Sequence, residues 1–145
     1  MREKQIRRVK DCFDTPEIYA VYAYCMYLPT WEKFCERAKT YMADNLTDMY
    51  ACFEGGCIAG VIAVKREPDE WAEVLGIAVN PDFRGHGVGT KLIDFVLCTL
   101  TCKGLAAETD DDAVGFYEKY GFEASAFLKN GVHRRYRCIY RCGGG

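Results

Sequence analysis

Apolar residues in the second half of the chain change their spacing on either side of a glycine-rich turn. From Trp71 to Val79 they form a nearly continuous run, which is typical of a strand buried in a sheet. Beyond the turn they recur at helical spacing, which predicts a helix that packs one face on that sheet. That face consists of Val88, Leu92, Ile93, Val96, Leu97 and Leu100.

The first half of the chain predicts a short strand followed by two helices. The strand is expected over residues 5–9. Thr15 and Pro16 predict a helix start, because threonine suits the N-cap and proline the first helical position, and this helix should end by Pro29. Thr30 is expected to cap the second helix. Apolar residues at helical spacing in it are Trp31, Phe34, Cys35, Ala38, Tyr41 and Met42.

A hairpin and a closing pair of strands complete the pattern. Residues 49–53 and 57–65 flank a glycine pair, which predicts a β-hairpin. Gly104 is expected to end the helical region that follows residue 88. The remaining elements are a strand over 105–109, a helix over 110–120, and strands over 122–128 and 134–140 joined by an Asn130-Gly131 turn. Strands alternating with helices predict an α/β protein with a mixed sheet.

Length and composition fit one small domain. The chain has 145 residues, half of them hydrophobic, and a formal net charge of −2. We expect a single domain over residues 1–142 and a flexible glycine tail over 143–145. No apolar run reaches the roughly 18 residues of a membrane span, and residues 1–8 lead into no secretory segment, so we expect a cytoplasmic protein.

The nine cysteines suggest a disulfide framework or a metal site, but their pattern fits neither. Their number is odd, their spacings lack the short pairs of zinc ribbons, and only two histidines could add ligands. We expect buried thiols that act as small hydrophobic side chains, and no metal. The arginines at 134, 135, 137 and 141 form a basic cluster, interpreted as a solvated strand edge.

The glycine-rich turn predicts an anion site. Gly85, Gly87 and Gly89 let the main chain approach a ligand, and they lie where the first N–H groups of a helix have no partner. The helix dipole adds positive potential, and Arg84 adds a full charge at the rim. Neither the Walker loop nor the dinucleotide fingerprint fits this glycine spacing.

Two motifs carry a resemblance to a known family. Arg84, Gly87 and Gly89 fill the pattern Gln/Arg-x-x-Gly-x-Gly/Ala between a strand and a helix, and residues 116–122 read Phe-Tyr-Glu-Lys-Tyr-Gly-Phe. Together they make residues 71–125 resemble the GNAT superfamily of N-acetyltransferases, whereas the first 50 residues match only in pattern. The resemblance implies a mixed central sheet of about six to seven strands with about four helices.

The resemblance also implies acetyl-CoA as the acetyl donor. Ile77 and Val79 would bind the pantetheine arm through main-chain groups, and the Val79 N–H would stabilise the oxyanion. Asp110 stands where relatives often carry an asparagine, so its contact would be an acceptor or a helix cap. The predicted cofactor-binding residues are Ile77, Ala78, Val79, Arg84, Gly85, His86, Gly87, Val88, Gly89, Thr90, Asp110 and Phe116.

Two residues are the catalytic candidates. Tyr117 resembles the general acid of the family and would protonate the departing CoA thiolate. Glu73 resembles the general base of some relatives and would take a proton from the attacking amine. Ordered water is an alternative base. Competing acids are Glu67, Asp69, Glu70 and Glu108.

The resemblance implies that the acceptor is an amine on a small molecule or a protein, and its pocket is expected from two weakly matching segments. These are the aromatic region over residues 19–31 and the segment over 127–137. We expect direct transfer in a ternary complex. A non-catalytic acyl-CoA-binding sensor is the alternative function, and a nucleic-acid-directed transferase using residues 134–141 is a weaker one. A homodimer stays open, and no membrane partner is expected.

Overall fold

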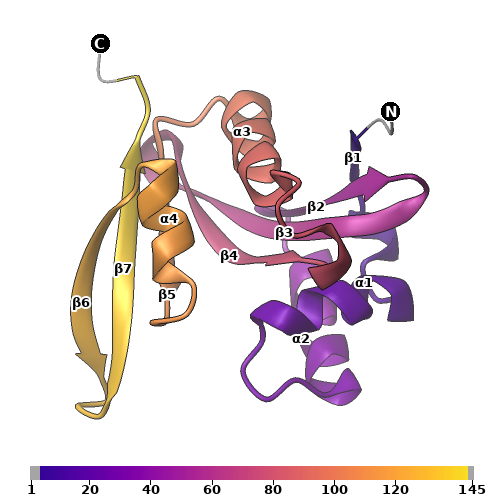
Figure 1. The fold of residues 1–145 in the computed structure, drawn as a ribbon, viewed down its shortest axis with the longest axis horizontal. Helices are drawn as coiled ribbons and strands as arrows, with labels where there is room; N and C mark the ends of the chain where they lie inside the picture. Colours follow the sequence, from indigo (N-terminus) through magenta and orange to yellow (C-terminus); the bar gives the residue numbers. More distant parts are fainter. Residues whose placement is uncertain (1–3, 144–145) are drawn as a thin grey trace.

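The computed structural model describes residues 4–143, which form seven strands and four α-helices around one sheet (Figure 1). The strands are β1 Lys4–Arg8, β2 Thr47–Glu54, β3 Cys57–Glu67, β4 Trp71–Val79, β5 Gly104–Thr109, β6 Glu123–Lys129 and β7 His133–Arg141. The helices are α1 Pro16–Tyr22, α2 Trp31–Ala43, α3 Val88–Leu100 and α4 Val114–Tyr120. Single 3₁₀ turns are η1 Lys10–Cys12, η2 Ala23–Cys25, η3 Pro68–Glu70 and η4 Pro81–Phe83. The predicted α/β class with a mixed sheet is confirmed.

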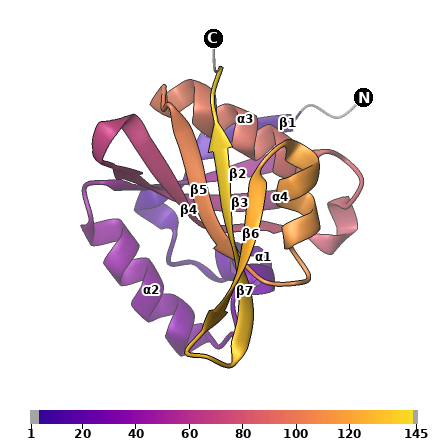
Figure 2. The ribbon, with the colours of Figure 1, turned by 90° about the vertical axis from the view of Figure 1, so that its left-hand side faces the viewer.

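The sheet has the order β1-β2-β3-β4-β5-β7-β6. All neighbours are antiparallel except β4 and β5, which run parallel. Helices α1 and α2 cover one face and bury Phe13, Tyr22 and Phe34 between themselves and β2–β4. Helices α3 and α4 cover the other face, where Leu92 and Leu105 lie in a second core cluster (Figures 1 and 2).

The predicted N-terminal elements are close to those observed. The first helix was expected to end by Pro29, and α1 ends at Tyr22. The 3₁₀ turn η2 follows it, and Met26 is then extended with its side chain buried. The Thr15 side chain makes no capping hydrogen bond, whereas the Thr30 hydroxyl accepts one from the Lys33 N–H at 3.1 Å, as predicted. The glycine-pair hairpin is confirmed as β2 and β3.

Two predicted helix boundaries are wrong. The helix expected over residues 110–120 begins only at Val114, after a turn in which the Asp110 carboxylate accepts hydrogen bonds from the N–H groups of Asp112 and Ala113. Helix α3 ends at Leu100, and its C-cap Thr101 has a φ of +47°, so the helix stops before Gly104. Gly104 is instead the first residue of β5.

The arginine cluster does not lie on a sheet edge. Strand β7 pairs with β5 on one side and β6 on the other, so β6 is the edge strand and the earlier interpretation is wrong. Arg134 pairs with Asp111 at 3.0 Å, and Arg135 pairs with Glu108 at 3.1 Å. These ion pairs leave less free positive charge than the sequence suggests.

The cysteines are free thiols in the described part of the chain. Cys52, Cys102 and Cys138 are buried, and burial raises the pKa of each thiol, so these three match the expected hydrophobic role. Cys12, Cys57 and Cys98 are exposed, contrary to that expectation.

Residues 4–143 contain no cluster of three or more side chains suited to hold a metal. They also contain no helix that is both long and apolar enough to cross a membrane. Of the predicted glycine tail, residues 144 and 145 lie outside the described part.

Gly104 is held at close quarters, which gives a first testable prediction. A Cβ added there would meet the Tyr140 carbonyl oxygen and lie 2.6 Å from the Trp71 ring, so Gly104→Ala should destabilise the fold by about 1–3 kcal/mol. Gly115 in α4 has open space around it, and Gly115→Ala should stabilise by about 0.4–1 kcal/mol. Urea unfolding of both variants checks the pair. Equal effects would contradict the packing described at the start of β5.

Candidate active site

Strands β4 and β5 separate halfway along β4. Their parallel pairing covers only Trp71–Val74 with Gly104–Ala107. A bulge shifts the register of β3 and β4 at the same point, between Ala63 and Val64. Residues 76–79 of β4 therefore pair only with β3, with Leu75 as the extra residue of the bulge. We call the region between residues 75–79 and residues 108–109 the splay (Figure 1). Main-chain groups of β4 that face the splay can pair with an extended ligand.

The glycine-rich turn follows directly at the end of β4. Asn80 fixes its start: the side-chain amide donates to the Ile58 carbonyl at 3.1 Å and the side-chain oxygen accepts from the Asp82 N–H at 3.0 Å. Gly85 and Gly87 have φ values of +82° and +72°, a region that L residues rarely occupy. Nothing lies within 4 Å of a Cβ built on either glycine, so the turn is open as well as left-handed.

The turn presents unpaired N–H groups at the start of α3. The first helical hydrogen bond there runs from the Lys91 N–H to the Gly87 carbonyl at 3.0 Å, so the N–H groups of residues 88–90 precede it. Arg84, His86 and Thr90 are exposed around them, and the helix is long enough for its dipole to matter. This combination suits a diphosphate. The anion site at these residues stays a prediction.

Gly89 has a different task from the other two glycines. It is buried in α3, and a Cβ there would lie 2.8 Å from the Phe116 ring of α4. Its small size therefore lets α4 pack against the first turn of α3. Through this contact the two sequence motifs come together, as their resemblance to one family implies, with Phe116 as packing partner of the turn.

Tyr117 of α4 lies near the splay, since its raised pKa is due to burial and partly to Cys25, whose thiol is close to the Ile77 N–H. The Tyr117 side chain is 4% exposed and packs edge-on against Phe116 and Phe122. Burial, followed by the nearby Cys25 and Cys138 thiols, raises the pKa of Tyr117, so the phenol stays protonated at neutral pH. Among the described residues its hydroxyl makes no hydrogen bond, which leaves the proton available to a ligand.

Cys25 approaches the same region from the opposite face of the sheet. Its thiol donates to the Tyr22 carbonyl oxygen at 3.2 Å and lies near the main-chain N–H of Ile77. Burial raises the pKa of Cys25 to about 12, so the group is a neutral thiol and a poor nucleophile. Sequence analysis missed this residue, because no motif distinguishes it from the other cysteines.

Glu73 lies on β4 just before the splay. Its neighbours Ala72 and Val74 point into the core beneath α3, so the Glu73 side chain faces the side of α1 and α2. It is close enough to Tyr41 of α2 to add to the raised pKa of that phenol, whose main cause is burial. Among the described residues Glu73 forms no ion pair. Glu73 and Tyr117 therefore belong to opposite faces, and the splay is the place where they can serve one reaction.

The competing acids are less suitable. Glu108 accepts hydrogen bonds from Lys129 and Arg135, at 3.0 and 3.1 Å, and these bonds lower the pKa of its carboxyl group despite some burial. A carboxylate held in this way is a weaker base. Glu70 pairs with Lys103 at 3.2 Å and precedes β4, at the end away from the splay. Glu67 and Asp69 lie at that same end.

A second tyrosine contacts the splayed part of β4. The Tyr22 hydroxyl is buried without a hydrogen-bond partner, and a Cβ on Gly76 would collide with it. Tyr22 was expected only as one of several aromatic residues near the acceptor. Its ring instead packs in the core against Phe13 and Phe34, and the glycine makes room for its hydroxyl.

Exposed apolar side chains gather on two segments at one end of the molecule. In Figures 1 and 2 the connection between α1 and α2 and the tip of the β6–β7 hairpin both lie at the lower end. The two segments fall within the regions expected to form the acceptor pocket, residues 19–31 and 127–137, and that role stays a prediction. The exposed side chains are Tyr24, Tyr27, Leu28 and Trp31 on the first and Phe127, Leu128 and Val132 on the second.

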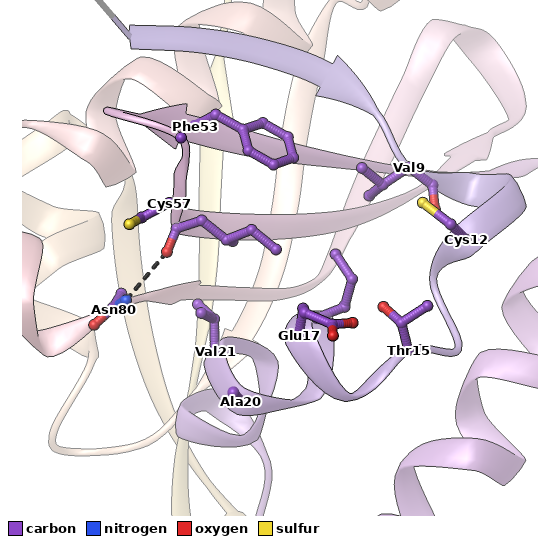
Figure 3. Close-up of a pocket in the computed structure, with 12 residues that line it drawn as sticks. Val9, Cys12, Thr15, Glu17, Ala20, Val21, Phe53, Cys57 and Asn80 are labelled. Carbon is purple, nitrogen blue, oxygen red and sulfur yellow. Dashed lines mark hydrogen bonds between the residues drawn. The ribbon is translucent and has the colours of Figure 1, made fainter. Parts of the chain in front are cut away.

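A separate pocket lies away from these residues. A mostly apolar pocket of about 510 Å³ opens between α1 and the β2–β3 hairpin (Figure 3). Val9, Val21 and Phe53 line it, and Asn80 marks the end nearest the turn. It contains none of the predicted catalytic or cofactor-binding residues. The predicted site instead consists of the splay and the exposed turn.

Comparison with known proteins gives a family match over most of the chain. Residues 11–122 match the family described as Acetyltransferase (GNAT) family. N-alpha-acetyltransferase 30 of Saccharomyces cerevisiae is 26% identical over 132 residues, a match that covers 83% of this chain and 70% of the yeast protein. Residues 11–122 include the glycine-rich turn, the aromatic motif and both candidate catalytic residues.

Solved structures share the fold at low sequence identity. The ribosomal-protein-S18-alanine N-acetyltransferase of Escherichia coli superposes with a TM-score of 0.75 at 17% identity, covering 99% of this chain and 96% of that one. A GNAT family acetyltransferase of Elizabethkingia anophelis with acetyl-CoA bound gives a TM-score of 0.70 at 19% identity, covering 95% and 97%. These similarities confirm the predicted single α/β fold.

Proposed function

The chain belongs to the acetyltransferase (GNAT) family and is an acetyl-CoA-dependent acyltransferase, and on this premise we propose that it acetylates a primary amine by direct attack in a ternary complex. The observation that carries the proposal is the junction of a strand end that is unpaired on its β5 side with an exposed, left-handed glycine turn. The strand end suits an extended arm and the turn suits a diphosphate, and CoA carries a pantetheine arm followed by a diphosphate.

The cofactor would lie along β4 and across the turn. Ile77, Ala78 and Val79 would bind the pantetheine arm through main-chain groups. The diphosphate would accept hydrogen bonds from the N–H groups at the start of α3, with Arg84 adding charge. Residues proposed to line the diphosphate site are Arg84, Gly85, His86, Gly87, Val88, Gly89 and Thr90. Phe116 and Asp110 would contribute indirectly, since one supports Gly89 and the other holds the turn before α4.

The chemistry transfers one acetyl group and two protons. The amine nitrogen forms a bond to the acetyl carbonyl carbon while the carbon–sulfur bond breaks. Glu73, directly or through water, would take the proton that the amine loses, and Tyr117 would give a proton to the departing sulfur. The Val79 N–H would stabilise the oxyanion. No bond to the protein forms, which agrees with the neutral, weakly nucleophilic Cys25 thiol.

We propose a peptide α-amine as the first acceptor class to test. Exposed aromatic and aliphatic side chains lie in the two segments expected to form the acceptor pocket, residues 19–31 and 127–137, which suits an uncharged peptide chain. A polycationic amine would need free acids there, but Glu108 and Asp111 are already paired with Lys129, Arg135 and Arg134. Two similar proteins are named as acting on protein amines: the yeast N-alpha-acetyltransferase and the E. coli enzyme for ribosomal protein S18.

The experiment that tests this function is an assay of CoA release from acetyl-CoA with a peptide library of varied N-terminal residues. Release that depends on a free α-amine, with acetyl found on that amine by mass spectrometry, supports the proposal. Release with polyamines and none with peptides would contradict the acceptor class. No release with any amine would favour the acyl-CoA-binding sensor instead.

Glu73→Gln tests the base directly. We expect kcat/KM near neutral pH to fall by about 10- to 100-fold, because the attacking amine must lose its proton without help. The loss should shrink as pH rises, since a larger share of the acceptor is then already neutral. Glu70→Gln is the matched control and should leave the rate unchanged. A Glu73→Gln rate equal to that of the control would assign the base to water alone.

A further inference from the structure

A buried carboxylate holds the histidine of the glycine-rich turn. His86 Nδ1 lies 2.9 Å from Glu54 Oε2, a contact between the turn and the end of β2 that spans 32 residues of sequence. The Glu54 side chain is 8% exposed, whereas the His86 side chain is 46% exposed. The imidazole therefore extends from an enclosed acid toward the open turn.

This contact determines which nitrogen carries the proton. An ionised carboxylate only accepts hydrogen bonds, so Nδ1 must be the donor in the pair. In the neutral ring the proton is then on Nδ1, and Nε2 is a bare acceptor. Nε2 becomes a donor only in the imidazolium. An anion in the turn can thus gain a donor and a charge from His86 only when the ring takes up a second proton.

The charges around the pair act on the imidazolium in opposite directions, because the Glu54 carboxylate favours it and the nearby cations oppose it. Lys4 of β1 lies 3.9 Å from the other Glu54 oxygen. The charges of Lys91 on α3, Lys4 and Glu54 all contribute to the pKa of the Cys52 thiol, so the three groups lie in the same neighbourhood. Arg84 is exposed in the turn itself. When His86 is neutral, the negative charge of Glu54 repels an anion in the turn. When His86 is protonated, its positive charge offsets that of Glu54 next to the proposed diphosphate position.

We propose that Glu54 and His86 form a proton-linked diphosphate sensor in which the turn binds CoA with uptake of a proton on His86. Glu54 is a positioning residue that fixes the tautomer and compensates the imidazolium. The inference rests on the proposed binding of CoA at this turn. It predicts that cofactor affinity falls as pH rises, by about tenfold between about pH 6 and pH 8.5, because binding takes up a proton.

The test is calorimetric titration with dephospho-CoA, which retains the diphosphate but lacks the phosphomonoester that titrates near neutral pH. Titrations at about pH 7.5 in two buffers of different ionisation enthalpy give the number of protons taken up. For the wild type we expect a clear fraction of one proton, together with the loss of affinity at high pH.

Three variants separate proton linkage from a merely structural role. His86→Arg supplies a fixed charge and should bind with little pH dependence and no proton uptake, with the affinity of the wild type at low pH. His86→Gln should bind weakly at every pH without proton uptake. Glu54→Gln should reduce the uptake by half or more, because the tautomer is no longer fixed.

The outcomes are distinct. Wild-type binding with flat pH dependence and no proton uptake would overturn the proton-linked role of Glu54 and His86 and leave the proposed cofactor site intact. Equal proton uptake in the wild type and in His86→Gln would also overturn it, since another group would then titrate. Absence of binding at every pH, to dephospho-CoA and acetyl-CoA alike, would overturn both the sensor and the proposed function.

Discussion

Replacing Gly87 with glutamate is expected to weaken acetyl-CoA binding by about 100-fold or more. The φ of +72° at this position strains any L side chain, so the turn would lose its shape. The added carboxylate would also stand beside the N–H groups that precede the first hydrogen bond of α3, and like charges facing each other cost several kcal/mol in binding. Calorimetric titration with acetyl-CoA measures the loss.

Gly131 supplies the matched control. It has a φ of +71° and open space around it, but it lies in the turn between β6 and β7. Gly131→Glu therefore introduces the same backbone strain and the same charge away from the proposed cofactor site. We expect its affinity for acetyl-CoA to equal that of the wild type. A similar loss in both variants would indicate a general effect of strain and would remove the turn from the binding site.

Tyr117→Phe is expected to lower kcat by about 100- to 1000-fold while acetyl-CoA affinity stays within a factor of two or so. The substitution removes only the hydroxyl, whose proton would otherwise go to the CoA sulfur. The fold should tolerate it, because that hydroxyl makes no hydrogen bond among the described residues and the ring keeps its contacts with Phe116 and Phe122. Steady-state kinetics and calorimetry together measure both quantities.

Tyr120→Phe is the control on the same helix. The Tyr120 hydroxyl donates to the Asp94 carboxylate at 2.5 Å, so its loss should lower stability slightly and leave kcat near the wild-type value. Equal kcat for Tyr117→Phe and the wild type would exclude Tyr117 as the acid. A wild-type protein that binds acetyl-CoA but never turns over would instead be the acyl-CoA-binding sensor.

The local parts of the candidate site were predictable from sequence. The turn follows from glycines at positions that need positive φ between an apolar strand and an amphipathic helix, and Asn130-Gly131 predicted the last hairpin for the same local reason. The strand from Trp71 to Val79 was predicted with its observed bounds, because its apolar run is nearly continuous.

Long-range features could not be predicted from the sequence, because no local pattern encodes them. The splay depends on a bulge in the pairing of β3 with β4 and on where β5 stops pairing, which are properties of three strands together. The Glu54–His86 contact joins distant residues, and in sequence Glu54 is one acid among many. The sheet order placed β7 inside the sheet, although its arginines suggested an edge.

The helix start was placed too early because helical spacing over residues 110–120 is compatible with one continuous helix. In the structure the Asp110 carboxylate accepts hydrogen bonds from the N–H groups of Asp112 and Ala113, a capping arrangement, within a turn that precedes α4. Helix α4 therefore has seven residues. The shortened helix still carries Phe116 and Tyr117 to the turn and the splay.

The most direct measurement is amide hydrogen exchange of the wild-type protein with and without acetyl-CoA. We predict that the cofactor slows exchange in residues 77–79 and 85–90, the splayed end of β4 and the glycine-rich turn. Exchange around the apolar pocket, at Cys12, Val21 and Cys57, should stay unchanged. Protection confined to that pocket, with residues 77–90 unaffected, would contradict the proposed site and the mechanism built on it.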